Sequence, residues 1–196
     1  MPCLIIKLLS QTASFRIPDF QNFQKSYPLP PPTTIIGLAG AALGLSPKAA
    51  QDFFSSGFKF GVYGHSEGTS NDLWKYKKLK SKGFISDVLI RQYYFLNTFL
   101  IVYSHEDYRI ISKLKNAFDD PVYALTTGNS DSLAKVKTSI HDGNVEECNE
   151  LKNCIVEGNI LEEALNNPGG LEFKMNSNPS SYEVPVQFKY ESDYGI

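Results

Sequence analysis

Five lysines and two aromatic residues share one short polar segment of the chain, WKYKKLKSKG. The segment holds Trp74, Lys75, Tyr76, Lys77, Lys78, Lys80 and Lys82. Ammonium groups spaced along an extended arm could follow a phosphate backbone, and the interleaved rings could stack on bases. An exposed hairpin kept soluble by its lysines is the alternative. Because five like charges within eight residues repel one another unless something neutralises them, we favour nucleic-acid binding.

A second group of cations and rings lies in FRIPDFQNFQKSY, residues 15–27. Arg16 and Lys25 flank phenylalanines there, and Tyr27 ends the segment. Exposed rings beside cations suit single-stranded RNA, whose bases splay onto aromatic faces. The same rings can equally anchor a long loop to the core, so both interpretations stay open. Arg16, Lys25 and Tyr27 are candidate RNA contacts, and Arg91 is a further cation that could contact phosphate.

The segment TTGNSDSLAKV, residues 126–136, could hold a phosphate through its backbone. Gly128 can adopt a positive φ, so the N–H groups of residues 129–131 could converge on an anion. The hydroxyl of Ser132 and the ammonium of Lys135 would add donors. The candidate contacts are Gly128, Asn129, Ser130 and Lys135. A glycine turn without any ligand is the plainer alternative.

The histidines that could serve as a general base are His65, His105 and His141, and none has metal-ligand spacing with cysteine or another histidine. A metal-independent ribonuclease needs a base for the 2′-hydroxyl proton and a cation for the phosphorane. His105 near Arg109, or His65 near the lysines, could supply them, although a histidine on a loop is usually only solvated. The sequence has no Walker loop, nucleophile elbow or paired-glutamate motif. We therefore expect no catalytic residue, no metal and no cofactor.

The whole chain has 196 residues and a net charge of −2, which suits one domain with a real core. Residues 1–118 carry 14 basic and 7 acidic side chains, whereas residues 119–196 carry 5 and 14. A basic front could meet a polyanion while the acidic tail faces solvent or protein; chance unevenness is the alternative. Three cysteines at unrelated spacings indicate thiols in a reducing cytoplasm. No apolar run reaches the roughly 20 residues of a membrane span.

Apolar periodicity predicts an α+β fold. We expect strands at 3–10, 58–64 and 122–126, a hairpin within 88–103 that turns at Asn97 and Thr98, and helices at 34–44, 47–54 and 105–118. With a polar insertion at 65–83 set aside, this order is the ferredoxin-like βαββαβ topology that RNA-recognition modules also use. The tail is placed only loosely, with a helix near 159–166 and a strand at 183–190.

The segment YPLPPPTTIIGLAGAALG, residues 27–44, joins a rigid proline run to an apolar helix. Residues 28–32 should be extended, and Thr33 or Thr34 should cap the helix. Glycines at positions 37, 40 and 44 form a stripe of small residues, so the helix could lie close to the sheet and to a second surface. The candidate docking residues are Pro30, Pro31, Pro32, Thr33, Thr34, Gly37 and Gly40.

Two segments resemble a known family. Residues 13–44, ASFRIPDFQNFQKSYPLPPPTTIIGLAGAALG, resemble the N-terminal signature of the CRISPR-associated Cas five family of the RAMP superfamily, and residues 114–136, LKNAFDDPVYALTTGNSDSLAKV, resemble its second recurrent region. The likeness covers the first two thirds of the chain and is nearest to subtype I-B. It implies a prokaryotic antiviral subunit of a type I Cascade surveillance complex. Such a subunit binds the 5′ handle of CRISPR RNA, caps the backbone subunit and contacts the large subunit. The second surface of the glycine-marked helix would then be a neighbouring chain or the handle.

The resemblance also implies a domain organisation and a chemistry. Residues 1–127 would form a ferredoxin-like domain with an inserted basic β-hairpin thumb at about 65–96, and residues 128–196 would form the glycine loop and an acidic extension packed on that domain. Subtype I-C relatives cleave precursor RNA with a tyrosine, a lysine and a histidine, the last two adjacent. Here Ser104 precedes His105, so we expect a non-catalytic subunit. Metal-independent cleavage of CRISPR repeat RNA is the alternative. Asn129 stands where the family often has arginine, which leaves backbone contacts in the glycine loop.

Overall fold

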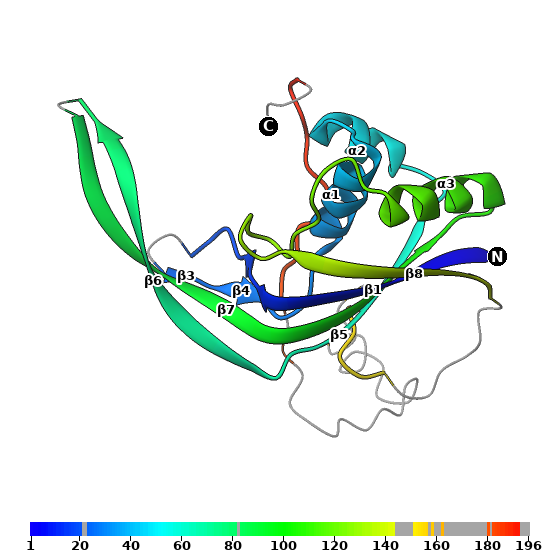
Figure 1. Cartoon of the computed structure of the whole chain (residues 1–196), viewed down its shortest axis with the longest axis horizontal. Helices are drawn as coiled ribbons and strands as arrows, with labels where there is room; N and C mark the ends of the chain where they lie inside the picture. The colour runs from blue at the N-terminus through cyan, green and yellow to red at the C-terminus, as the bar shows by residue number, and fades with distance from the viewer. Residues whose placement is uncertain are drawn as a thin grey trace.

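A computed structural model describes residues 1–20, 23–81, 83–143, 151–156, 158, 162, 180 and 182–192. The fold is a mixed α+β arrangement around an antiparallel sheet (Figure 1). β1 (Pro2–Ala13) lies between β7 (Gly83–Ser104) and β8 (Ala134–Asp142), and β5 (Lys59–His65) pairs with the other side of β7. In the order β8-β1-β7-β5, the N-terminal strand β1 therefore pairs with β8, which lies more than a hundred residues later in the chain.

One face of the sheet is apolar because its strands alternate. Leu4, Ile6 and Leu8 of β1 and Phe99 and Ile101 of β7 are buried on the same side. The helices α1 (Pro32–Leu43), α2 (Pro47–Phe53) and α3 (Tyr108–Asp119) lie on that side of the sheet (Figure 1). The strands expected at 3–10 and 58–64 and the three expected helices are confirmed, with boundaries that differ by a few residues.

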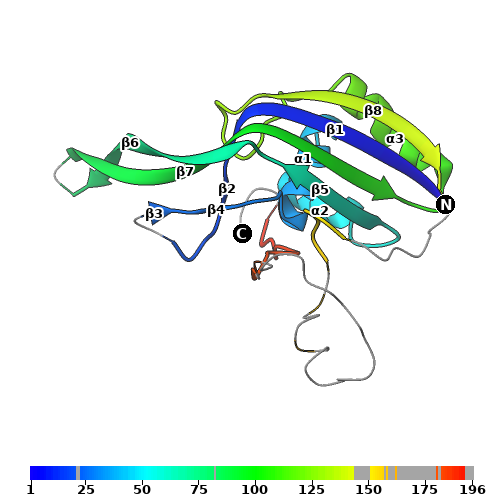
Figure 2. The same cartoon turned by 90° about the horizontal axis from the view of Figure 1, so that it is seen from below.

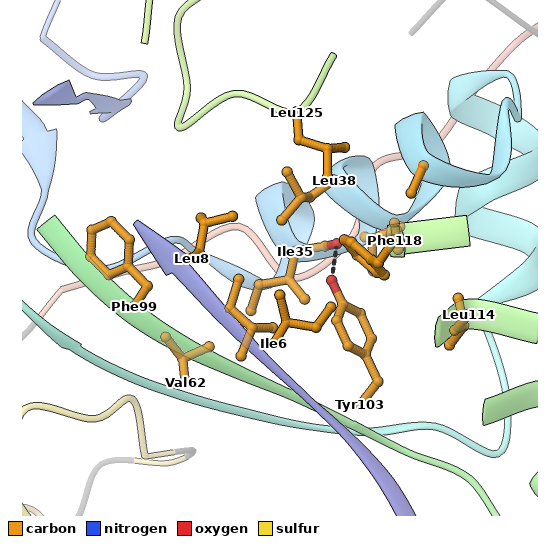
Figure 3. Packing of buried hydrophobic residues seen from close by; sticks show 14 of the residues in the cluster. Ile6, Leu8, Ile35, Leu38, Val62, Phe99, Tyr103, Leu114, Phe118 and Leu125 are labelled. Carbon is orange, nitrogen blue, oxygen red and sulfur yellow. Dashed lines mark hydrogen bonds between the residues drawn. The ribbon is translucent and has the colours of Figure 1, made fainter. Parts of the chain in front are cut away.

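The core closes where α1 and α3 meet the sheet (Figure 3). Ile111, Leu114 and Phe118, spaced three or four residues apart on α3, are buried. Tyr103 of β7 is fully buried, and its hydroxyl donates a hydrogen bond of 2.8 Å to the carbonyl oxygen of Ile35 in α1. Burial raises the pKa of the Tyr103 phenol well above its usual value. A protonated phenol thus joins the sheet to the helix layer.

Helix α1 begins earlier than the sequence predicts. Pro32 is its first residue, Pro31 is the N-cap, and no side chain caps the first turn. The backbone N–H groups of Thr34 and Ile35 donate to the carbonyl of Pro31 instead. The predictions of a cap at Thr33 or Thr34 and of an extended Pro32 are therefore wrong. Proline suits the first helical position because it needs no donor there and its fixed φ is already helical.

Strand β7 runs straight through the turn expected at Asn97 and Thr98, so the prediction of a hairpin there is wrong. Asn97 is buried, and its amide nitrogen donates to the carbonyl of Tyr94 at 3.1 Å and to the hydroxyl of Ser10 at 3.3 Å. Its amide oxygen accepts from the hydroxyl of Ser66 at 2.6 Å. Asn97, which the local sequence predicts to lie in a turn, therefore joins neighbouring strands by hydrogen bonds.

A long two-stranded ribbon projects from the body (Figures 1 and 2). β6 (Gly68–Lys80) pairs with β7 in the same antiparallel register as β5, from Lys59–Ser104 to Lys80–Gly83, with residues 66–67 and 96–97 left unpaired between the two ladders. Leu96, with φ +50°, marks the interruption between the two halves. We term β6 together with residues 83–95 of β7 the arm. Its first strand, β6, falls within the insertion at 65–83 that the sequence marks as polar and basic.

The last strand of the sheet is not where the sequence predicts it. Residues 122–126 form no strand, and Val122 and Tyr123 are exposed, so that prediction is wrong. The fourth strand is β8, whose every second residue is polar and exposed. Its inward side chains are only half-buried. The apolar pattern of β8 is therefore weaker than that of residues 122–126, although β8 is the strand.

Three short strands and the described tail complete the fold. β2 (Phe15–Arg16) pairs with β4 (Ser26–Tyr27), and β3 (Phe23–Gln24) runs parallel to residues 90–91 of β7. Residues 182–190 form no strand, so the one expected at 183–190 is wrong. Residues 182–190 are held against the rest of the chain by isolated hydrogen bonds. In one of them the Tyr27 hydroxyl donates to the carbonyl oxygen of Glu183 at 2.7 Å. The helix expected at 159–166 lies, apart from residue 162, outside the described residues. None of the helices that the structure describes has the length and apolar character to cross a membrane.

Candidate nucleic-acid interface

The register of the arm divides its lysines between two faces. Directly paired residues of an antiparallel ladder point to the same side. Lys75 and Lys77, opposite Val88 and Ser86, therefore share one face, which we term the aliphatic face. Its exposed apolar members are Leu73, Leu79, Phe84, Val88 and Ile90. Lys80 pairs with Gly83, and Lys82 lies outside the described residues.

The other face, which we term the aromatic face, carries Trp74, Tyr76 and Lys78. The rings of Trp74 and Tyr76 stack with centroids 5.8 Å apart and planes 20° from parallel. The Tyr76 hydroxyl donates to the Asp87 carboxylate on β7 at 3.2 Å, which holds the phenol in place. Two stacked, partly exposed rings beside a cation form a surface on which bases can stack.

Arg91 lies at the root of the aromatic face and is only 7% exposed. Its guanidinium lies over the rings of Trp74, at 4.9 Å, and Tyr93, at 4.6 Å. The same group lies 3.8 Å from the carboxylates of both Asp72, on β6, and Asp131, in the Gly128 loop. Arg91 therefore joins the arm to the loop, and two carboxylates already balance its charge. Its prediction as a phosphate contact is not tested by this geometry.

The Gly128 loop is held close to the N-terminal strand. Gly128 has φ +101°, and a Cβ there would come within 1.9 Å of the carbonyl oxygen of Ser14, so only glycine fits. The Ser132 hydroxyl is buried and hydrogen-bonded to the Thr12 hydroxyl at 2.8 Å, so it is not available to a phosphate. In the part of the chain that the structure describes, no hydrogen bond uses the backbone N–H groups of residues 129–131. These N–H groups are the donors that the loop can offer.

The loop candidates differ in exposure. Ser130 and Lys135 are exposed, whereas the amide nitrogen of Asn129 is buried and has no partner among the described residues. The loop therefore presents a hydroxyl and backbone donors toward solvent, with Lys135 on the strand that follows.

The N-terminal cluster is only partly open. Arg16 and Lys25 are exposed, and the ammonium of Lys25 lies 4.6 Å from the centre of the Phe20 ring. Tyr27 is buried, its hydroxyl is bonded to Glu183, and its ring packs edge-on against Tyr182 at 5.9 Å. Burial, Asp19 and Glu183 raise the pKa of Tyr27. Tyr27 thus anchors the C-terminal segment, and its ring is not open for stacking.

The candidate docking residues on the proline run and α1 are largely occupied by the chain itself. Pro30, Pro31 and Gly40 are buried. A Cβ at Gly40 would come within 2.6 Å of the Ala50 side chain, so the close second surface of α1 is α2 of the same chain. Thr33 donates its backbone N–H to the carbonyl of Pro185 at 3.4 Å. Pro32, Thr33 and Thr34 are half-buried. Gly37 is exposed and has open space at its Cβ position.

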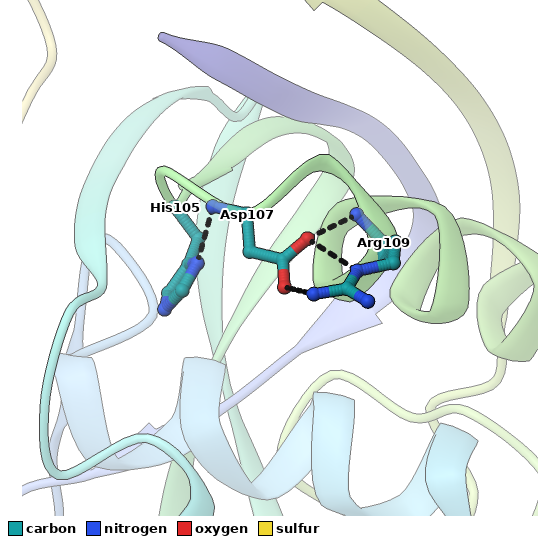
Figure 4. Close-up of polar contacts among 3 residues, drawn as sticks. All are labelled: His105, Asp107 and Arg109. Carbon is teal, nitrogen blue, oxygen red and sulfur yellow. Dashed lines mark hydrogen bonds and ion pairs between the residues drawn. The ribbon is translucent and has the colours of Figure 1, made fainter.

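His105 and Arg109 both bond to Asp107, the residue that caps the N-terminus of α3 (Figure 4). Asp107 caps α3, accepting from the backbone N–H of Arg109 at 2.8 Å and from its guanidinium at 3.0 and 3.2 Å. These bonds to Arg109 lower the pKa of Asp107. Nδ1 of His105 accepts the backbone N–H of Asp107 at 2.9 Å, and its Nε2 faces Gly57. His65 lies 3.5 Å from the Glu67 carboxylate.

Sequence reasoning missed two parts of this interface. The acidic partners of Arg91, Asp72 and Asp131, carried no signal, because only folding brings them together from segments far apart. The separation of Lys75 and Lys77 from Lys78 did have a signal, since residues of a strand alternate between faces. A strand prediction through the lysines would have found it.

Comparisons with known proteins bear on the family. A family model described as "CRISPR-associated protein (Cas_Cas5)" matches residues 3–190. A chain of a solved "CRISPR RNA-guided surveillance complex" is similar with a TM-score of 0.57 and 14% identity, over 68% of this chain and 60% of that chain. A solved "Cas protein" gives a TM-score of 0.48 and 20% identity, over 74% of this chain and 66% of that one. The search of curated proteins found no match. The first structural likeness indicates a shared fold, and this chain spans 60% of that relative's length.

Proposed function

This chain belongs to the CRISPR-associated protein (Cas_Cas5) family, and we propose that it is a non-catalytic subunit of a type I Cascade complex that binds the 5′ handle of CRISPR RNA. Within that complex it caps the backbone subunit and contacts the large subunit, as part of antiviral defence in a prokaryotic cytoplasm. We further propose that it belongs to subtype I-B, which the sequence as a whole resembles most. Its likeness in fold to a chain of a surveillance complex supports the general assignment.

The observation that carries the RNA proposal is the junction of two different surfaces at Arg91. The aromatic face offers stacked rings and Lys78, while the Gly128 loop offers backbone donors and a hydroxyl. Arg91 connects both through Asp72 and Asp131. Rings bind bases and N–H groups bind phosphates, so a single strand of RNA can use both surfaces at once.

The sheet supports a ferredoxin-like assignment. The order β8-β1-β7-β5, with α1 and α2 between β1 and β5 and α3 between β7 and β8, matches a βαββαβ arrangement. We propose that the arm is the thumb inserted into this fold. Leu79 and Phe84 near its tip, 72% and 71% exposed, would then be available to another subunit.

The proposal of a non-catalytic subunit draws support from His105. A general base needs a free ring nitrogen near the proton it removes. Nδ1 of His105 is occupied by a backbone N–H, Nε2 faces Gly57, and the ring packs against Phe58 at 4.8 Å. The charge of Arg109 is engaged by Asp107. Incubating the purified chain with CRISPR repeat RNA in EDTA tests this point: we expect no cleavage. Specific cleavage that disappears in His105→Ala would contradict it.

The two faces of the arm provide a matched test of RNA binding. Lys78→Gln removes a cation from the aromatic face, and Lys77→Gln removes its neighbour from the aliphatic face. For single-stranded RNA, each lost phosphate contact lowers the slope of log affinity against log salt by about 0.7. We expect this change for Lys78→Gln and none for Lys77→Gln. The measurement is fluorescence anisotropy of a labelled handle RNA over a salt series.

A ring substitution separates stacking from charge. Trp74→Leu should weaken handle binding by about 1–3 kcal/mol without changing the salt slope, because stacking releases no counterions. Circular dichroism checks that the arm is still folded. Equal effects of Lys77→Gln and Lys78→Gln would contradict the choice of face. If all three variants keep the wild-type affinity and salt slope, the proposal that this chain binds RNA is wrong.

A further inference from the structure

Three exposed lysines lie together on the outer face of the sheet, on the side away from the helices. Residues 151–156 of the chain contact the β5 side of this face, and the lysines lie on its β1–β8 side. Lys7 of β1 pairs directly with Lys137 of β8, and Lys135 is the next outward residue along β8, opposite Leu9. The residues on either side of Lys7 are buried in the core, so alternation directs the Lys7 side chain outward. Directly opposed Cβ atoms lie about 5 Å apart, so the side chains of Lys7 and Lys137 leave the sheet next to each other.

Within the part of the chain that the structure describes, this arrangement is unfavourable. Like charges placed directly opposite each other destabilise a sheet. Within the described residues, none of the three lysines has an ion-pair partner. Lysines are common on edge strands, where they prevent pairing with other chains, and this accounts for Lys135 and Lys137. It does not account for Lys7, because β1 is an interior strand between β7 and β8.

A hollow adjoins the lysines at the root of the arm. Its walls include Leu9, Leu96 and Leu133, and its polar groups include Gln11, Thr98 and Lys135. Leu96 and Leu133 are both exposed. Apolar walls with an amide and a hydroxyl suit a planar base, which has apolar faces and hydrogen-bonding edges. The hollow also lies between the lysines and the arm, since Leu96 marks the end of the arm.

We propose that the β1–β8 side of this outer face is a second binding track for single-stranded RNA, in which Lys7, Lys135 and Lys137 contact phosphates and the hollow receives a base. The inference rests on the proposed function, since the strand would be the one held by the arm. An acidic protein could neutralise the lysines, but a polymer with a charge at every unit and a base on each suits both the lysine cluster and the hollow beside it. The track extends the contact from the arm across the sheet.

A triple variant tests the track through charge. Lys7→Gln, Lys135→Gln and Lys137→Gln are combined in the full chain and titrated with fluorescein-labelled CRISPR repeat RNA of two lengths. We expect the salt slope for an RNA of about 20 nucleotides to fall by about 2, from three lost contacts at about 0.7 each. For an RNA of about 8 nucleotides, which is short enough to bind to the arm alone, the salt slope should fall by less. Lys113→Gln, an exposed lysine on α3 in the helix layer, is the control and should leave both slopes unchanged.

A charge reversal separates binding from folding. Lys7→Glu places an opposite charge beside Lys137, so it should raise the Tm of the free chain at low salt while weakening the binding of the longer RNA. A purely structural lysine would change the Tm and leave RNA binding unaltered.

The outcomes distinguish the two proposals. If Lys78→Gln lowers the salt slope and the triple variant does not, the track is wrong and the proposed function stands. If neither variant changes the slope, the RNA-binding function fails as well. If the triple variant instead weakens assembly with other subunits at an unchanged slope, a protein covers this face and the track is overturned.

Discussion

At the scale of single residues, Tyr103 shows how much one buried polar group can decide. Its hydroxyl is fully buried and reaches the carbonyl of Ile35 at 2.8 Å. Tyr103→Phe removes this hydrogen bond and should lower the free energy of unfolding at neutral pH by about 1 kcal/mol, measured by urea denaturation. Tyr108→Phe is the control, because Tyr108 is 58% exposed. Equal stability of wild type and Tyr103→Phe would contradict the role of this bond.

The same phenol predicts a response to pH. Burial raises the pKa of Tyr103 in the folded state, so the unfolded chain ionises first as the pH rises through about 10. The folded state then loses stability with rising pH, and below that range the phenol has no such effect. Tyr103→Phe should therefore show a shallower loss of stability between about pH 9 and pH 11 than wild type. Parallel losses in the two proteins would contradict the assignment.

Two glycines predict opposite outcomes for the same substitution. Gly128→Ala would force a Cβ to 1.9 Å from the Ser14 carbonyl oxygen at φ +101°, so it should lower the Tm and displace the loop. Gly37→Ala has open space on a helix and should stabilise the free chain by up to about 1 kcal/mol. If Gly37 lies in a subunit interface, as the docking prediction holds, the same Ala would weaken assembly despite the gain in stability. Thermal unfolding and size-exclusion chromatography with partner subunits measure the two effects.

At the scale of elements, Arg91 fixes how the arm meets the body. Lysine keeps the charge but lacks the planar guanidinium that stacks between Trp74 and Tyr93. Arg91→Lys should therefore loosen the arm root and the Gly128 loop together, by about 0.5–2 kcal/mol of local opening free energy. Hydrogen exchange should become faster in residues 70–74, 89–93 and 128–132, and stay unchanged in β1 and α3. Faster exchange in the arm alone would contradict the link through Asp131.

The elements also show what could be predicted from the sequence. α3 and β1 have strong periods, and both were located correctly. β8 was missed because its inward residues are only half-buried, and the turn at Asn97 was wrong because long-range hydrogen bonds override a local preference. The lysine segment identified the arm as a candidate site. The faces of the arm depend on the register that pairs Lys80 with Gly83, and the position of Arg91 depends on partners that sequence spacing does not reveal.

At the scale of the whole molecule, the described C-terminal residues tie separate parts of the body together. Glu183 meets β4 through Tyr27, Pro185 accepts from the first turn of α1, and Phe188 donates its N–H to Gln51 of α2 at 3.5 Å. Residues expected to dock partners, around Thr33, are therefore partly covered by the chain's own tail. A partner that uses the N-terminus of α1 would have to displace this segment, whereas Gly37 and most of the arm are exposed among the described residues.

The shared register from Lys59–Ser104 to Lys80–Gly83 restricts how the length of the arm can change. Adding one residue to each strand would extend the ribbon by about 3.4 Å and exchange the two faces beyond the insertion. The rings would then point where the aliphatic side chains now lie. Only additions of two residues per strand, about 7 Å at a time, keep the same chemistry on the same side. The length of the arm can therefore change only in steps of two residues per strand if each face is to keep its side chains.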